Sequence, residues 1–104
     1  SFPGSLKRML DSELKNCIHK PVAFVGVSSG PFGGVRAIEA LIGMVREIGM
    51  VATFADVMVS KSYEAFDERG QPTASYLEDS VRGMYEELIW MAKSLKWGRD
   101  NLPS

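Results

Sequence analysis

The residues of this chain that are best suited to chemistry are small and polar, and they follow directly on a short apolar run. Residues 22–27 read VAFVGV, and residues 28–36 read SSGPFGGVR. Serine and glycine leave the backbone accessible, so N–H groups at the start of a following helix can approach a flat or anionic ligand closely. Ligands of open α/β sheets bind at such strand ends. The stretch therefore predicts a binding loop.

Two strands and a helix must position this loop. Residues 22–27, bounded by Pro21, fit a parallel strand that is covered on both faces. The spacing of apolar residues after Gly34 predicts a helix that ends at Gly49, a suitable C-cap residue. Residues 50–59 form the second strand candidate, an apolar run that is interrupted only by Thr53 and Asp56.

Further elements are expected on either side of this unit. An apolar stripe over residues 1–16 predicts an amphipathic helix, and the polar residues 61–73 predict a long loop. The last helix follows, with Ser75 and Glu78 as a capping box, Thr73 as a competing cap and Gly98 as its end. Residues 99–104 are predicted to be a tail. The inner face of the last helix is predicted to consist of Leu77, Val81, Met84, Tyr85, Leu88, Ala92 and Leu95.

The order of these elements predicts a parallel sheet that is incomplete. A strand, a helix and a second strand form a right-handed parallel crossover. Two parallel strands make an inadequate sheet, because such sheets need cover on both faces and neighbours at their edges. The apolar edge over residues 22–27 therefore predicts further strands from a second chain or an unseen segment.

Composition limits the class of protein. The chain has 104 residues, a formal net charge of −1 and 45% apolar residues, which fits one ordinary globular domain and argues against nucleic acid or an anionic membrane as partner. No apolar run reaches the length of a membrane span, and no signal peptide opens the chain. The single cysteine, Cys17, gives neither an internal disulfide nor a metal motif, so we expect a cytoplasmic protein without a metal site.

Several motifs together resemble one family. The opening SFPGSLKRMLD, the stretch KPVAFVGVSSGPFGGVRA, the later GMV and EAFDERG, and the long terminal helix are similar to the C-terminal half of the NADPH-dependent FMN reductases. The most specific parts are S-x-P-G-x-L-K and S-G-P-x-G-G-x-R. The G-S-x-R-x-x-S loop that grips the FMN phosphate in that family does not occur in this sequence, nor do the P-E-Y-N residues that usually precede S-x-P-G.

The resemblance implies a fold and an activity. Residues 1–104 would form the C-terminal part of one α/β, flavodoxin-like domain, supplying about two strands and three helices of its five-stranded, three-layer parallel sheet. Family members pass a hydride from NAD(P)H through FMN to a quinone, an azo compound or a metal species, and they are often homo-oligomers. Because the flavin carries this chemistry, no catalytic side chain or metal is expected from this chain.

The resemblance also assigns cofactor-binding residues in two segments. The first segment would lie beside the isoalloxazine ring, and the second would offer backbone N–H groups to its polar edge. A helix N-terminus and a tight turn are the plain structural interpretations of the two. Arg36 lies where the helix dipole disfavours a cation, and either an anionic group or a salt bridge accounts for it. The assigned residues are Ser1, Pro3, Gly4, Leu6, Ser28, Ser29, Gly30, Gly33 and Arg36.

Two other functions stay open at this point. The chain is alternatively a non-catalytic α/β interaction module or a fragment that does not bind FMN by itself, and the absent phosphate loop favours this. A simple anion-binding domain ranks last. Trp90 and Trp97 on the last helix are interpreted as packing or interface residues, as are Tyr63 and Phe66 in the long loop, because apolar residues in polar surroundings often dock on a partner.

Overall fold

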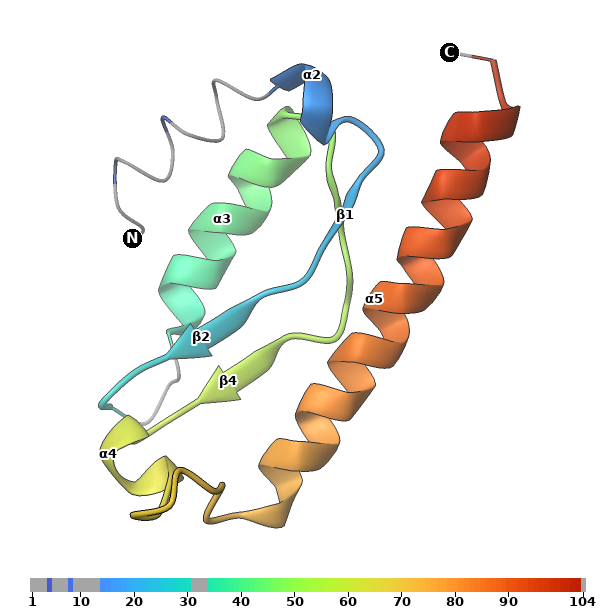
Figure 1. Ribbon diagram of the computed structural model, residues 1–104. Coiled ribbons are helices and arrows are strands. Elements are labelled where there is room, and N and C mark those ends of the chain that lie inside the picture. Colours follow the sequence, from blue (N-terminus) through green and yellow to red (C-terminus); the bar gives the residue numbers. More distant parts are fainter. Residues whose placement is uncertain (1–3, 5–7, 9–13, 31–33, 104) are drawn as a thin grey trace.

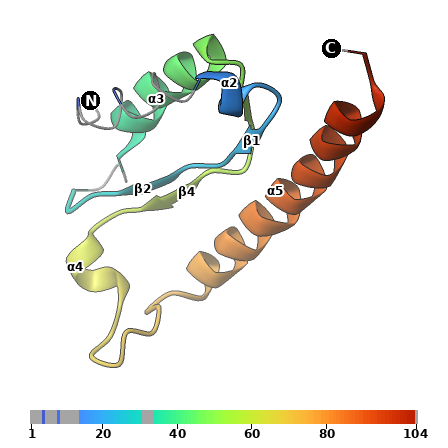
Figure 2. The same ribbon diagram turned by 45° about the horizontal axis from the view of Figure 1, so that its top comes forward.

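The computed structural model describes residues 4, 8, 14–30 and 34–103 of the chain. Two short parallel strand pairs lie between a helix on one side and a long helix on the other (Figures 1 and 2). The predicted helix over residues 1–16 lies mostly outside the described residues. Its end is visible as the short helix α2, Leu14–Cys17, which leads into the first strand.

Each predicted strand forms two short strands in place of one. The first consists of β1, Pro21–Val22, and β2, Val25–Val27; the second of β3, Val51–Ala52, and β4, Val57–Val59. β1 pairs with β3 and β2 with β4, and both pairs are parallel, as predicted.

The break between the strand pairs has a simple cause in the register. Val22 pairs with Ala52 and Val25 with Val57, so two residues on the first strand lie opposite four residues on the second. The two extra residues cannot fit in the ladder and bulge outward. Phe54 in this bulge is 84% exposed, whereas a regular strand would pair its backbone and alternate its side chains between the faces.

The helix α3, Val35–Glu47, packs on one face of the strands and confirms the predicted second helix. Its buried Ile38 and Val45 form a cluster with Phe24 from the first strand. Gly49 has φ 87°, the left-handed conformation that a glycine after a helix adopts readily, so the predicted C-terminal stop is also confirmed.

The helix α5, Ser75–Asn101, covers the other face, but its predicted ends are wrong. Ala74 is the N-cap and makes no side-chain cap hydrogen bond, so no capping box forms. The hydroxyl of Thr73 instead donates to the carbonyl oxygen of Glu64 at 2.7 Å. Gly98 does not end the helix, because its carbonyl accepts a hydrogen bond from the N–H of Leu102 at 2.9 Å and the helix continues to Asn101.

The inner face of α5 is largely as predicted. Leu77 and Met84 are buried and form a second cluster with Val57 and Val59 of β4. The prediction that Tyr85 lies on this face is wrong, since Tyr85 is 54% exposed.

The predicted loop over residues 61–73 contains regular structure. Residues Ser62–Ala65 form the short helix α4, and Phe66 makes an antiparallel bridge with Pro72. The backbone groups of the segment are thus partly satisfied within it, which the polar composition did not reveal.

The predicted cover on both faces of the first strand is wrong in the described part of the chain. Phe24 and Gly26 are buried, but Val25 and Val27 are 54% and 62% exposed. They line an apolar hollow together with Val57 of β4 and further residues of α5. This exposed surface, the Val25/Val27 face, is the open side of the sheet.

Among the described residues, no helix combines the length and the apolar character that crossing a membrane requires.

Candidate functional site

The segments that follow β2 and β4 are fastened to each other by backbone hydrogen bonds. The N–H of Ser28 donates to the carbonyl of Val59, and the N–H of Ser62 donates to the carbonyl of Ser28, both at 2.9 Å. The N–H of Lys61 donates to the carbonyl of Gly30, also at 2.9 Å. The two parallel strands therefore end at one edge, the place where open α/β sheets bind ligands.

The loop after β2 is held in a defined turn by its own side chain. The N–H of Gly30 donates to the Oγ of Ser28 at 3.0 Å. Ser28 is half-buried, while Ser29 is exposed. A ligand at this edge would thus meet a preformed backbone surface.

The start of α3 offers uncapped backbone donors beside this loop. Gly34 is the N-cap residue and forms no side-chain cap, and the first turn contains no acidic residue. The N–H groups of a first helical turn have no partner within the helix, so they attract an anion or a carbonyl oxygen. Arg36 lies in this turn and is exposed. Within the described residues no carboxylate forms an ion pair with it, so the salt-bridge interpretation gains no support.

Gly34 also brings α3 against β2. Its φ is 82°, and a Cβ at this position would lie 3.3 Å from the Cα of Gly26. Two glycines therefore let the helix start approach the strand backbone closely. The sequence pointed to Gly34 only as one of the small loop residues that leave the backbone accessible to a ligand, and its packing role was missed.

The remaining predicted site residues are placed unequally. Ser1, Pro3, Leu6 and Gly33 lie outside the described residues. Gly4 is exposed, and a Cβ on it would meet no described residue within 4 Å, so no contact of Gly4 with the described part of the binding loop supports its predicted role. Of the predicted site residues that the structure describes, Ser28, Ser29 and Gly30 lie together in the loop after β2, and Arg36 lies in the first turn of α3.

The structure adds one residue to this edge that sequence reasoning missed. Lys61 has φ 47°, unusual for a residue with a side chain, and it is the N-cap of α4. Its exposed side chain adds a positive charge beside the binding loop. The rule that ligands bind where parallel strands end could have found it, because Lys61 lies two residues after the end of the second predicted strand.

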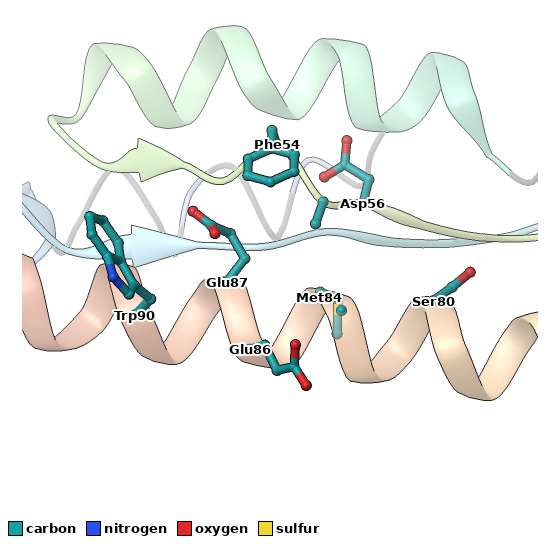
Figure 3. A pocket seen from close by; sticks show the side chains of 9 residues that line it. Phe54, Asp56, Ser80, Met84, Glu86, Glu87 and Trp90 are labelled. Carbon is teal, nitrogen blue, oxygen red and sulfur yellow. The ribbon is translucent and has the colours of Figure 1, made fainter.

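A second hollow lies between the bulge and α5, away from this loop (Figure 3). Glu87 and Trp90 extend from α5 toward the segment that carries Phe54, whereas Glu86 points away from it. Burial raises the pKa of the Asp56 carboxyl, partly offset by a backbone hydrogen bond at Phe24. No group of acidic, histidine or cysteine side chains in the described part of the chain is arranged to hold a metal ion.

Comparison with known proteins gives one result. The family model of the NADPH-dependent FMN reductases matches residues 1–64, which include the binding loop, α3 and both strand pairs. The helix α5 lies outside the match, although the resemblance seen in the sequence extended to it. No curated protein matches the chain. The parallel strands with helices on both faces agree with the flavodoxin-like fold of this family, and the chain belongs to the NADPH-dependent FMN reductase family.

Proposed function

We propose that this chain forms one wall of the FMN site of an NAD(P)H oxidoreductase whose acceptor is a quinone, an azo compound or a metal species. The observation that carries the proposal is the fastened edge at the ends of β2 and β4. The loop that the resemblance assigns to the flavin begins at this edge, and the uncapped start of α3 packs against β2 through Gly34 and Gly26.

The residues at this edge fit the polar rim of a flavin. FMN, when bound, supplies hydride transfer from NAD(P)H to the acceptor. The loop over Ser28, Ser29 and Gly30 presents backbone at close range, because none of these residues carries a bulky side chain. Gly33, with the N–H groups of α3, would extend this surface. Arg36 and Lys61 would favour an anionic group near the rim.

The first segment of the chain would supply a second contact. By resemblance, Ser1, Pro3, Gly4 and Leu6 lie beside the isoalloxazine ring. No side chain of this chain needs to act as acid or base, and no metal is required. The chain's role is to bind and orient the ring.

The phosphate of FMN requires the other half of the domain. We propose that this half, on a second chain or on an unseen segment, covers the Val25/Val27 face. Every second residue along the first strand hydrogen-bonds through its backbone to the segment of β3 and β4. The carbonyls of Lys20, Val22 and Phe24 accept such bonds, and the N–H of Ser28 donates one. The backbone groups of Val25 and Val27 therefore point to the opposite edge, where another parallel strand can pair. Residues 1–104 would then be the C-terminal part of a single domain in the reducing cytoplasm.

Native and denaturing mass spectrometry of the purified protein, with its visible absorbance spectrum, tests the proposal. We expect a second polypeptide or a longer chain that carries the missing strands, together with bound FMN. A lone 11.5 kDa chain that stays colourless when FMN is added would overturn the proposal and favour the non-catalytic interaction module. Protection against heat by phosphate but not by FMN would favour an anion-binding domain.

A further inference from the structure

The bulge between β3 and β4 holds an aromatic ring out in solvent. Phe54 is 84% exposed, the largest exposed fraction among the large apolar side chains that the described structure leaves uncovered. Bulges beside ligand sites re-aim single side chains in this way. Leaving a phenylalanine in water forgoes the free energy of burying it, so a ligand that covers the ring would gain that free energy.

The ring of Phe54 borders a hollow of about 730 Å³, which Trp90 of α5 borders on another side (Figure 3). Trp90 is 63% exposed. Two small residues of α5, Ser80 and Gly83, also line the space, and a Cβ at Gly83 would meet nothing within 4 Å. Small-molecule pockets typically measure roughly 300–1,000 Å³, so the volume suits such a ligand. We call the space lined by Phe54, Gly83, Glu87 and Trp90 the aromatic hollow.

The aromatic hollow is acidic. Three acidic residues border it, and none of the lysines, arginines and histidines that the structure describes does so. Figure 3 shows the Glu87 side chain between the Phe54 ring and the Trp90 indole, whereas Glu86 points away. The third acidic residue, Asp56, has a buried Oδ1. Glu87 is half-buried and forms no hydrogen bond or ion pair with any described residue, so it is the carboxylate that a ligand would meet.

Two aromatic rings beside an unpaired carboxylate fit a cation. The faces of tryptophan and phenylalanine attract a positive charge, and a carboxylate neutralises it. A primary ammonium carries three N–H donors and a guanidinium carries five, and each donor that leaves water needs an acceptor. The ring walls beside Glu87 offer none, so a cation without N–H donors fits better. We propose that the aromatic hollow binds a small quaternary ammonium ion, with its methyl groups against Phe54 and Trp90 and its charge beside Glu87.

The aromatic hollow is separate from the surfaces assigned above. It shares no lining residue with the hollow beside Val25 and Val27. The binding loop follows β2, whereas the aromatic hollow lies at the bulge that precedes β4. The proposal therefore does not rest on FMN binding, and either can fail without the other.

Choline and its uncharged carbon isostere, 3,3-dimethylbutan-1-ol, test the proposal. Titration calorimetry on the purified protein should show choline binding roughly tenfold more tightly than the isostere, because only choline carries a charge. Equal affinities would overturn the proposal, since a hollow that recognises only apolar surface binds both alike. An absence of choline binding at millimolar concentration would also overturn it. So would binding of phosphatidylcholine vesicles without binding of free choline, which would assign the surface to a lipid headgroup.

Two pairs of variants locate the bound ion. Glu87→Gln should raise the dissociation constant for choline by roughly two- to fivefold and remove most of its dependence on salt. Glu86→Gln removes the neighbouring carboxylate, which points away, and should have no effect. Trp90→Leu should raise the constant by roughly five- to thirtyfold. Trp97→Leu, about two turns further along α5 and outside the lining, is its control. Equal effects within either pair would contradict the assignment.

A substitution at Gly83 should block the aromatic hollow without harming the fold. Gly83 lies within α5, where leucine is a better helix former than glycine, and the new side chain would extend into open space. Gly83→Leu should therefore bind choline at least roughly tenfold more weakly, while its thermal midpoint does not fall. Circular dichroism confirms that each variant is folded. Full choline affinity in Gly83→Leu would place the ion elsewhere and overturn the proposal.

Discussion

Gly34 and Gly26 bring the first turn of α3 against the backbone of β2, and a Cβ on Gly34 would lie 3.3 Å from the Gly26 Cα. This contact fixes where the uncapped helix start lies relative to the strand ends. The position of the candidate site thus depends on two residues that have no side chain.

Replacing Gly34 should therefore destabilise the protein. Gly34→Ala places a side chain at φ 82°, which costs about 1–2 kcal/mol, and adds a close contact with Gly26. Urea denaturation measures the loss. Gly43→Ala, at an exposed position within α3 where a Cβ meets nothing within 4 Å, should instead stabilise by about 0.8–1 kcal/mol. Equal effects at the two positions would contradict the packing role of Gly34.

A substitution at Gly30 should weaken ligand binding without affecting the fold. Its φ is not positive, and a Cβ there would lie in ordinary contact with the Ser28 Oγ at 3.5 Å, so Gly30→Ala should fold normally. The added methyl group would hold the loop backbone away from a flat ring. Losing about one hydrogen bond of roughly 1.4 kcal/mol should weaken FMN binding about tenfold. Quenching of flavin fluorescence measures the affinity, with Gly43→Ala as control. An unchanged FMN affinity in Gly30→Ala would show that the loop does not contact the flavin.

Alanine substitutions of Val57 and Val27 test whether the Val25/Val27 face is covered in the assembled protein. Val57 is 1% exposed, and Val57→Ala should cost about 2 kcal/mol in any state of the protein. Val27 is 62% exposed, so Val27→Ala should cost less than about 0.5 kcal/mol in the chain alone. In an assembly that covers the Val25/Val27 face the two losses should become similar. Denaturant midpoints of the chain alone and of the assembly give the comparison. If Val27→Ala has no effect on stability in the assembly either, the Val25/Val27 face is not covered there.

Asp56 should make stability depend on pH. Its Oδ1 is buried and has no hydrogen-bond partner among the described residues, and burial raises the pKa of the carboxyl. The folded state then holds the proton more tightly than the unfolded state. Above the raised pKa of the folded state, the buried charge destabilises the protein to its full extent. As the pH falls through this pKa toward the ordinary pKa of a carboxyl, the folded state takes up the proton first and the stability should rise.

Two variants isolate this effect. Asp56→Asn should stabilise the protein at neutral pH, and its advantage should shrink as the pH falls. Asp100 should show the opposite dependence on pH, because a hydrogen bond from Lys96 lowers the pKa of its carboxyl. Asp100→Asn should lose stability at neutral pH, and its deficit should disappear in acid. Thermal midpoints from pH 3 to pH 7 are the measurement, and parallel curves for all proteins would contradict the assignment.

The sequence by itself determined the family, the parallel crossover and the loop that follows the first strand. Local patterns carry these features: an apolar run before glycines predicts a strand and a turn, and apolar spacing predicts α3 to its stop at Gly49. The predicted burial of the strand on both faces is wrong in the described part of the chain, because Val25 and Val27 are exposed. The inner face of α5 followed from the same periodicity. Tyr85 did not, because an aromatic residue at the border of a stripe can face either way.

The tertiary structure alone decided how these parts meet. The break in the strands depends on two extra residues between Ala52 and Val57, the partners of Val22 and Val25, a mismatch that exists only once the strands pair. The fastening of Gly30 to Lys61 joins residues 31 positions apart in the sequence. No local pattern encodes such a contact, because its free energy comes from the paired strands that bring the two segments to one edge.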